Sequence, residues 1–313
     1  MPKKREIIDY LYEIGDVERR IKLRENEDVE IHRVSMGENA INGELAWISE
    51  SKIRIQPKAP KKFKGSLLIA PAEFRKTCPE SKRIAWCKDP KLAFIKTVNK
   101  FFPELTITQW PRIGEPPVHS TASVGQQVHL SHGVVIGSGV IIDDGVFVGP
   151  NTVIANAIVK CGCKIGANCS IGLPGFGFAV DNEGRYWRFP HIGRVVIEEA
   201  VEIGSNTCID RGGLGDTIVG GGSKIDNLVH IAHNVTLGKN AIVIANSMIG
   251  GSAAFAGNVW VAPSVSVRNK IKVGEQAVLG MGAVVLKDVG EMSIMGGNPA
   301  RLLRKRGGHE KQF

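Results

Sequence analysis

Hydrophobic residues recur at every sixth position through much of the chain. An uninterrupted run of this period extends from Val219 to Val285. A second run, of seven aliphatic positions, lies earlier in the chain. That run is Val118, Val124, Leu130, Ile136, Ile142, Val148 and Ile154. A helix repeats every 3.6 residues and an ordinary strand every two, so neither predicts a sustained period of six. The pattern predicts short flat strands joined by corners, three to a coil of 18 residues, stacked as a parallel β-helix.

Glycine often follows the inward aliphatic residue, as at Gly125, Gly149, Gly204 and Gly238. The chain contains 37 glycines, and their regular spacing argues against a merely flexible, linker-like role. We interpret this position as the corner of each coil, where glycine would supply backbone dihedrals that other residues avoid.

The repeat is interrupted between Ile171 and Ile197, where about 20 residues are inserted over the range 173–196. The insertion carries five of the chain's 19 aromatic residues: Phe176, Phe178, Tyr186, Trp187 and Phe189. Two interpretations remain open. The aromatic side chains either pack on the prism or a neighbouring subunit, or form a lid over an apolar or sugar ligand.

Residues 1–110 lack the repeat and read as a small mixed α/β domain. We expect helices over 5–15 and 91–102, the second opened by Asp89-Pro90, and strands over 43–49 and 65–71. A proline-rich linker at 103–117 leads into the repeats. The predicted organisation is an α/β domain at 1–110, a β-helix at 111–288 and a tail at 289–313.

The charge and the cysteine content bear on the partners and the compartment of the protein. The net charge is +9, and basic runs at 58–65 and 301–308 indicate either a solvated surface or an anionic partner. No nucleic-acid-binding module, secretory signal or apolar run long enough for a membrane span is present. The six cysteines lack disulfide-scaffold or zinc spacing, which predicts reduced thiols in a cytoplasmic protein.

One histidine stands out as a candidate catalytic base. His233 lies two positions after the inward Ile231, at a corner where we expect its side chain to face outward. Gly251 follows 18 residues later, so one coil would place its N–H beside the imidazole. A base next to an oxyanion donor is the pair that attack of an amine on a thioester needs. Asp226 either orients His233 or is a corner residue.

Four segments resemble a known family: GLPGFGFA at 172–179, FPHIGRVVI at 189–197, VEIGSNTCIDRGGLGDTIVG at 201–220 and IDNLVHIAHNVTLGKN at 225–240. Over most of its length the chain resembles the UDP-3-O-(3-hydroxyacyl)glucosamine N-acyltransferases of lipid A and lipopolysaccharide biosynthesis, which are hexapeptide-repeat enzymes. The resemblance implies a left-handed β-helix and a homotrimer with active sites between subunits. It also implies His233 as general base, Asp226 as its partner, Gly251 as oxyanion donor and Trp47 against the nucleobase.

The end of the chain departs from that family. Its segment VLKDVGEMSIMGGNPARLLRKR is similar to the acetyl-CoA-dependent sugar acetyltransferases, and Lys270 stands where the family has a second histidine. The acyl donor is therefore left open between acyl-CoA and acyl-carrier protein. We expect Gly250, Lys270 and Arg301 to contact this donor. The expected acceptor-binding residues, besides Trp47, are Phe176, Phe178, His191 and Asn234.

These features predict an N-acyltransferase that moves an acyl group from a thioester to the amine of a nucleotide-linked amino sugar. No permanently bound cofactor and no metal are expected. Three alternatives remain: an acetyl-CoA-dependent sugar acetyltransferase of surface-polysaccharide synthesis, a metal-dependent hydratase like the γ-carbonic anhydrases, and a non-catalytic scaffold. The hydratase would need three convergent histidine ligands.

Overall fold

The computed structural model describes residues 1–15, 17, 23–37, 40–56, 62–77, 83–112 and 114–307. Part of the basic run at 58–65, Cys78 and residues 308–313 lie outside this description. The chain divides into two compact units. One comprises Met1–Ile107 and Gly177–Pro190, and the other comprises Thr108–Phe176 and His191–Phe313.

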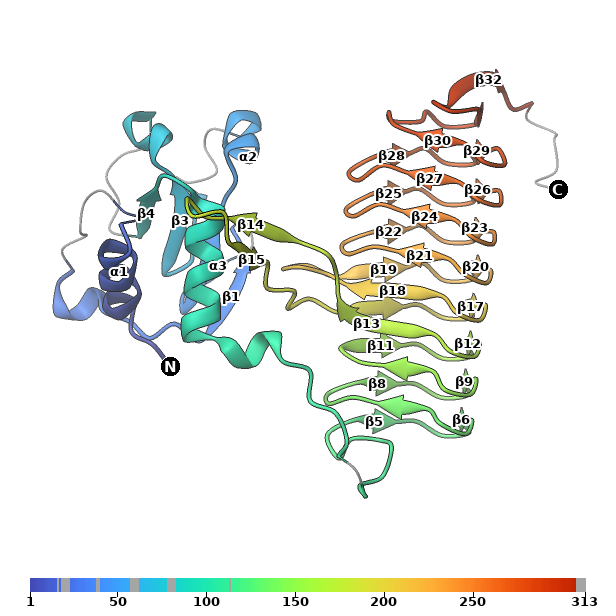
Figure 1. Ribbon diagram of the computed structural model, residues 1–313, viewed down its shortest axis with the longest axis horizontal. Helices are drawn as coiled ribbons and strands as arrows, with labels where there is room; N and C mark the ends of the chain where they lie inside the picture. The colour runs from blue at the N-terminus through green and yellow to red at the C-terminus, as the bar shows by residue number, and fades with distance from the viewer. Residues whose placement is uncertain are drawn as a thin grey trace. The chain divides into compact units, whose positions relative to one another are not determined.

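The first unit is built on a four-stranded parallel sheet in the order β1-β2-β3-β4 (Figure 1). Its strands are β1 (Arg33–Met36), β2 (Glu44–Trp47), β3 (Leu67–Pro71) and β4 (Ile84–Cys87). Its helices are α1 (Lys4–Glu13), α2 (Glu50–Ile55) and α3 (Pro90–Phe101), with 3₁₀ turns η1 (Glu25–Glu27), η3 (Ala72–Thr77) and η4 (Pro103–Thr106). Every residue of β3 and β4 is buried, as is usual for parallel strands.

The predicted elements of this unit are confirmed as α1, α3, β2 and β3. α3 begins where Asp89 accepts a hydrogen bond from the Leu92 N–H at 2.9 Å, and Pro90 occupies its first turn. Sequence reasoning missed β1, β4 and α2, short elements of four to six residues in which hydrophobic periodicity gives only a weak signal. None of the described helices is long and apolar enough to cross a bilayer.

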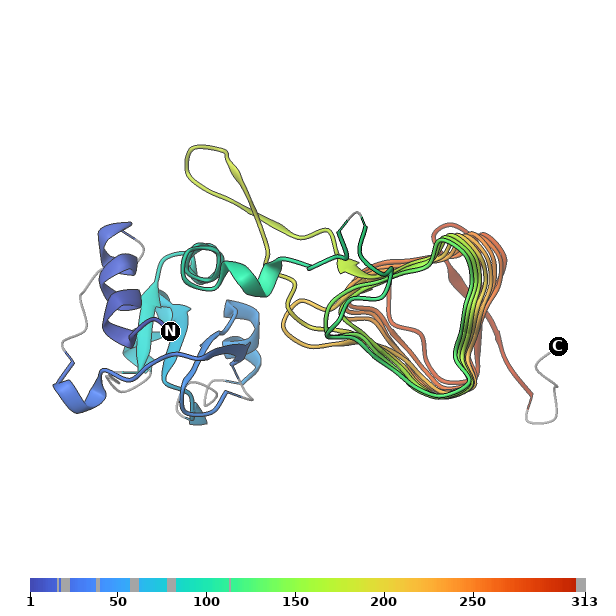
Figure 2. The same cartoon turned by 90° about the horizontal axis from the view of Figure 1, so that it is seen from below.

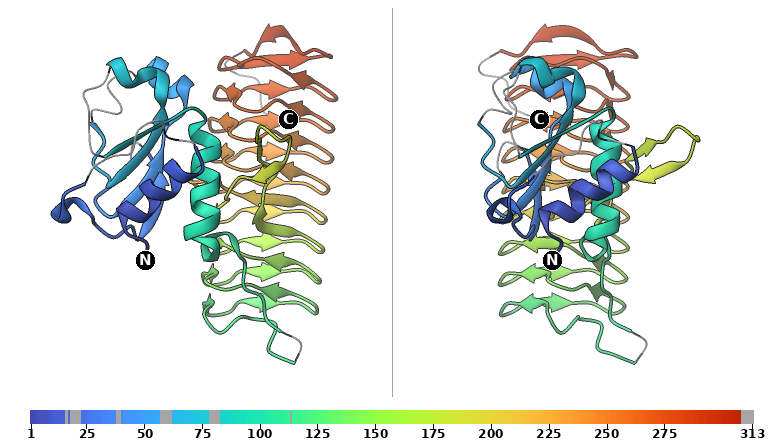
Figure 3. Two further views of the ribbon diagram at one scale, coloured as in Figure 1. Left: turned by 60° about the vertical axis from the view of Figure 1, so that its left-hand side comes forward. Right: turned by 90° about the vertical axis from the view of Figure 1, so that its left-hand side faces the viewer.

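The second unit is a parallel β-helix of triangular cross-section, which is seen along its axis in Figure 2. The coils stack regularly one above another (Figure 3). His230 pairs with Met248, and Met248 with Ser266, so each of these coils takes the 18 residues that the sequence predicts. The repeating architecture is therefore confirmed.

The strands fall on three flat faces. The first face holds β7 (Val135–Ile136), β10 (Val153–Ile154), β13 (Ser170–Pro174), β18 (Cys208–Arg211), β21 (His230–Ile231), β24 (Met248–Ile249), β27 (Ser266–Val267) and β30 (Val284–Val285). The second holds β5 (Ser123–Val124), β8 (Ile141–Ile142), β11 (Ala157–Val159), β16 (Val195–Ile197), β19 (Thr217–Val219), β22 (Thr236–Leu237), β25 (Ala254–Phe255) and β28 (Lys272–Val273).

The third face holds β6 (His129–Leu130), β9 (Phe147–Val148), β12 (Lys164–Ile165), β17 (Glu202–Ile203), β20 (Lys224–Ile225), β23 (Ile242–Val243), β26 (Trp260–Val261), β29 (Val278–Leu279), β31 (Ser293–Gly296) and β32 (Arg301–Lys305). β31 and β32 form an antiparallel hairpin at the end of this face. Every residue of β32 is exposed.

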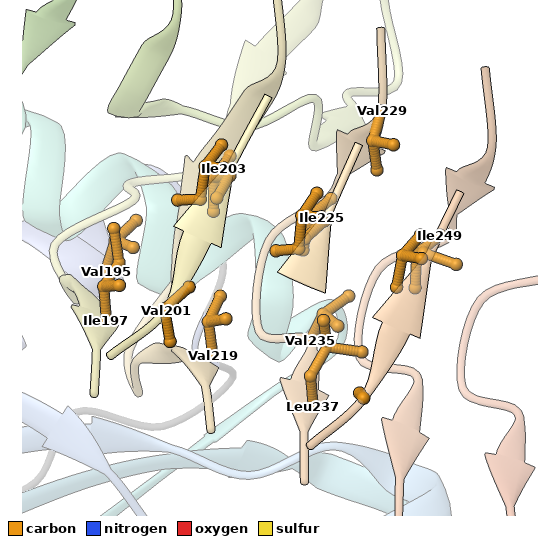
Figure 4. Close-up of a cluster of buried hydrophobic side chains, with 14 of the residues drawn as sticks. Val195, Ile197, Val201, Ile203, Val219, Ile225, Val229, Val235, Leu237 and Ile249 are labelled. Atoms are coloured by element: carbon orange, nitrogen blue, oxygen red, sulfur yellow. The ribbon is translucent and has the colours of Figure 1, made fainter. Parts of the chain in front are cut away.

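The core of the β-helix is a column of mostly aliphatic side chains: the residue that recurs every six positions and, in most hexapeptides, the residue two positions before it, as in the pair Val235 and Leu237. Figure 4 shows members of this column, among them Val219 and Ile225 from one coil and Leu237 and Ile249 from the next. These four side chains are almost completely buried. Burial of each such side chain stabilises the fold by about 1.5–3 kcal/mol. The column begins gradually, because Val124 in the first coil is 39 % exposed.

The glycine that follows the inward residue does not turn the corner, so that interpretation was wrong. The left-handed backbone lies two positions further along, at residues such as Asn234 (φ 59°), Asn246 (φ 61°) and Asn258 (φ 56°). Asparagine tolerates this region better than most residues. A Cβ on Gly238 would lie 2.5 Å from the carbonyl carbon of Ala256 in the next coil. Glycine at this position therefore permits the close approach of successive coils.

The insertion after Ile171 leaves the β-helix and joins the first unit over Gly177–Pro190. It forms a two-stranded hairpin of β14 (Phe178–Val180) and β15 (Tyr186–Arg188). Asp181 anchors the turn by accepting hydrogen bonds from Trp187 Nε1 at 2.8 Å and from the Arg185 backbone at 2.9 Å. The bond from Trp187 is the largest of the interactions that lower the pKa of the Asp181 carboxyl.

Replacing Gly238 by alanine should destabilise the β-helix, because the new methyl group would press on the backbone of the next coil. We expect a loss of about 1–3 kcal/mol in the free energy of unfolding, the usual range for overpacking. Guanidinium denaturation at a fixed protein concentration measures it. Gly257→Ala is the matched control, because its Cβ would meet only the Lys239 carbonyl oxygen at 3.4 Å. Equal midpoints for the two variants would contradict the explanation.

Candidate active site

A hollow of about 250 Å³ opens at one corner of the β-helix, where the strands of the first face end. Its lining comes from successive coils and comprises Phe176, Asp210, His230, Ala232, His233, Gly251, Ser252, Asn269 and Lys270. The structure thus brings together four residues that the sequence singled out: Phe176, His233, Gly251 and Lys270. The ladder that aligns His230 with Met248 and Ile231 with Ile249 places them there.

His233 and Gly251 are immediate neighbours. A Cβ on Gly251 would lie 2.8 Å from His233 Nε2, so only glycine leaves that face of the imidazole open. No hydrogen bond within the described part of the chain uses the Gly251 N–H, whereas the Gly251 carbonyl accepts one from Lys270 N at 2.9 Å. An open imidazole nitrogen therefore stands beside a backbone donor that is free to bind a ligand.

Asn234 fixes the tautomer of His233. Its Nδ2 donates to the Gly215 carbonyl at 2.9 Å, and its Oδ1 accepts from the Gly213 N–H at 2.9 Å, so the orientation of the amide is determined. The same Oδ1 lies 3.1 Å from His233 Nδ1. An oxygen can only accept, so Nδ1 of the neutral ring carries the proton. The lone pair is left on Nε2, which faces Gly251. Asn234 is expected from the sequence to bind substrate, but the structure places it against the base.

Asp226 does not lie beside His233 within the chain. It follows β20 on the third face, and its carboxylate accepts hydrogen bonds from the backbone of Asn227 at 2.7 Å and of Ala245 at 3.2 Å. The carboxylate in the hollow is Asp210, whose Oδ2 lies 3.7 Å from His230 Nε2. Burial raises the pKa of the Asp210 carboxyl, while His230 and His233 act in the opposite direction.

The wall beside His233 is made by the segment that returns from the insertion. His191 is buried, and its ring centroid lies 5.2 Å from that of His233 at an angle of 70°. Arg211 Nε donates to the Gly193 carbonyl at 2.7 Å and so anchors this segment. Burial lowers the pKa of Arg211 to about 10. His191 thus packs against the base, within the protein interior.

The remaining predicted site residues lie outside the hollow. In the first unit Trp47 packs against Phe94 and Phe189, with ring centroids 6.0 and 6.2 Å away. Phe178 belongs to the β14–β15 hairpin and contacts Tyr186 edge-on at 6.3 Å. In the second unit, Gly250 donates its N–H to Val267 at 2.9 Å, and Arg301 is exposed on β32.

Sequence reasoning missed Asp210, Ser252 and Asn269. A signal for Asp210 exists, because it directly follows the inward Ile209, which pairs with Ile231. The distance along the chain is 22 residues instead of 18, since four residues are inserted after Arg211. Among the described residues, no three His, Cys, Asp or Glu side chains are grouped so as to hold a metal.

Comparison with known proteins finds that part of the chain is similar in sequence to proteins named as acyltransferases. No family model matches it. A UDP-3-O-acylglucosamine N-acyltransferase of Methylobacterium sp. (strain 4-46) is 43% identical over 135 residues, which are 43% of this chain and 38% of that protein. The protein of the same name from Caulobacter sp. (strain K31) is 42% identical over 142 residues, covering 45% and 42%. The chain thus spans about two fifths of the length of these curated relatives.

A solved structure described as a UDP-N-acetylglucosamine acyltransferase matches with a TM-score of 0.53 at 18% identity, over 59% of this chain and 70% of that one. This likeness concerns the fold, and it confirms the predicted left-handed parallel β-helix. The predicted small α/β unit is seen in the four-stranded sheet and helices of the first unit. The resemblance drawn from the motifs is confirmed as well: over about two fifths of its length the chain is similar in sequence to the UDP-3-O-acylglucosamine N-acyltransferases.

Proposed function

We propose that this protein is an N-acyltransferase that moves an acyl group from a thioester to the amine of a nucleotide-linked amino sugar. The relatives' name supplies the acceptor class, a UDP-3-O-acylglucosamine. The observation that carries the proposal is the pairing of His233 Nε2 with the unobstructed backbone of Gly251. This is the arrangement that acyl transfer to an amine requires.

The chemistry follows from these groups. The amine nitrogen attacks the thioester carbonyl carbon while His233 Nε2 takes a proton from it, which contributes about 10²–10⁴-fold to the rate. The Gly251 N–H donates to the oxygen that becomes negative, and such a donor is worth about 10²–10³-fold. When the tetrahedral intermediate collapses, the carbon–sulfur bond breaks. The imidazolium then returns the proton to the departing thiolate.

The donor in this proposal is an acyl-CoA or an acyl-carrier protein, and no cofactor is permanently bound. Lys270 lies in the hollow beside Gly251, where a cation suits an anionic donor. Arg301 adds positive charge on the exposed strand β32, and Gly250 precedes the oxyanion donor. In this proposal these three residues bind the acyl donor. His191 supports the base, and Trp47, Phe176 and Phe178 are assigned to the acceptor.

The proposal includes a homotrimer in the cytoplasm that acts in lipid A biosynthesis. The five described cysteines are free thiols, which suits a reducing compartment. The alternative in which the β-helix is a scaffold without catalysis differs in one respect that can be measured, namely whether the rate depends on His233.

His233→Ala should lower acyl transfer at least 100-fold, because the base is lost while the inward column remains intact. The assay combines UDP-3-O-acylglucosamine with acyl-CoA and acyl-carrier donors and detects the amide by mass spectrometry. His132→Ala, a change at an exposed β-helix histidine outside the hollow, serves as the control. A variant lacking His233 that keeps more than a tenth of the rate would favour the scaffold hypothesis.

Gly251→Ala should slow transfer strongly and leave the fold intact. The added Cβ would occupy the space 2.8 Å from His233 Nε2 where the proton is transferred, and it meets a side chain rather than backbone. We expect a loss of at least tenfold in kcat, with an unchanged thermal midpoint, measured on the same preparation. An unaffected kcat would remove Gly251 from the site.

Asn234→Asp should shift the pH dependence of transfer. The carboxylate still accepts from His233 Nδ1, but its negative charge favours the imidazolium over the neutral ring. Because the neutral ring is the active base, the acidic limb of the kcat/KM profile should move to higher pH. Asn234→Ala, which loses the orienting contact, should lower kcat without this displacement. Superimposable profiles for Asn234→Asp and the parent protein would contradict the role given to Asn234.

A further inference from the structure

Asp210 is the one acidic side chain in the lining of the hollow. Its side chain is 17 % exposed, and its carboxylate makes no hydrogen bond within the described part of the chain. His230 Nε2 lies 3.7 Å from Asp210 Oδ2, beyond hydrogen-bond range. Burying a carboxylate without hydrogen-bond donors costs free energy. A ligand that donates hydrogen bonds to Asp210 would remove this penalty.

Other aspartates at the same position of the repeat do have partners. Asp226, which follows the inward Ile225, accepts two backbone N–H groups. Asp143, which follows the inward Ile142, lies 3.4 Å from Lys160 Nζ. The position itself therefore does not leave a carboxylate unsatisfied. Asp210 differs because its acceptor oxygens border the hollow.

The carboxylate also lies close to the base. A Cβ on Gly175 would lie 3.2 Å from Asp210 Oδ2 and 3.0 Å from His233 Cβ, so both side chains border the same glycine. The hollow therefore brings together an anionic group, the base, and Gly251, which is the immediate neighbour of the base. A group bound by Asp210 is held within reach of His233.

We propose that Asp210 binds the ammonium group of the acceptor and thereby makes the site prefer an amine to a hydroxyl. This inference rests on the proposed acyl transfer and names the residue that selects the reacting group. A cation gains more than a neutral hydroxyl from a half-buried carboxylate, because charge-assisted hydrogen bonds are the stronger kind. The preference is therefore built into the binding step.

The acceptor binds as R–NH₃⁺ and releases one proton to water, which leaves a neutral amine beside Asp210. The amine nitrogen forms a bond to the thioester carbon, and His233 receives the second proton. The carbon–sulfur bond then breaks and the thiolate takes that proton. One ammonium and one thioester thus give one amide, one thiol and one proton in solution.

The test compares the binding of two probes by calorimetry: UDP-3-O-acylglucosamine and the matching UDP-3-O-acylglucose, which has a hydroxyl in place of the amine. We expect the parent protein to prefer the amine, and Asp210→Asn to reduce this preference about tenfold or more. Affinity for the hydroxyl probe should persist in the variant, which shows that the site is still folded. Asp143→Asn, at the same position of the repeat, should keep the full preference.

The outcomes separate the two ideas. If Asp210→Asn keeps the parent's preference for the amine, the inference is overturned while the proposed acyl transfer stands. The same holds if the parent protein binds both probes equally. If the parent protein binds neither probe, the proposed function fails and the inference fails with it. Asp210→Glu provides a further check, because it retains the charge and should restore part of the preference.

Discussion

The hydrogen-bonded register between coils is the constraint on which the rest of the structure depends. Each backbone strand pairs with the strand one coil away, as Ile231 pairs with Ile249. This pairing stacks the inward aliphatic side chains into one column, and it also fixes which outward side chains become neighbours. The site is a consequence of the same register, because His233, Gly251 and Lys270 come from consecutive coils.

Inward and outward positions of the coil differ in which residues they tolerate. Inside, the column accepts Val, Ile or Leu at almost any level, because thin layers of similar volume stack interchangeably. Outside, one corner combines Gly251, an imidazole held by Asn234, and Asp210, whose carboxylate makes no hydrogen bond to the residues that the structure describes. Two insertions set this corner apart. One supplies Phe176 and His191, and the other supplies the glycines that hold the Asn234 amide.

Much of the fold was predictable because a period of six has one simple structural solution. The adjacency of His233 and Gly251 followed from arithmetic on that period. The same arithmetic could not find Asp210, since four inserted residues lengthen the path to Ile231. It also misplaced Asp226, because a step of seven residues carries the chain from one face of the triangle to the next.

The first unit was less readable. Its helices α1 and α3 were recognised from their amphipathic spacing and from the Asp89 cap, whereas of its short strands β1 and β4 were missed. The place of Asn234 was also hidden in the sequence. Its role depends on hydrogen bonds to the loop of Gly213 and Gly215, which no local pattern encodes.

A solenoid makes its contacts mainly between neighbouring repeats. The hollow uses only the coils that carry Phe176, Asp210, His233, Gly251 and Lys270. The coil of β5, at the start of the stack, supports it only through intervening layers, whereas β30 pairs directly with β27, the strand before Lys270. Whole coils can therefore be gained or lost at the β5 end during evolution while the reacting groups keep their spacing, so the length of this prism can change there without a change in its chemistry.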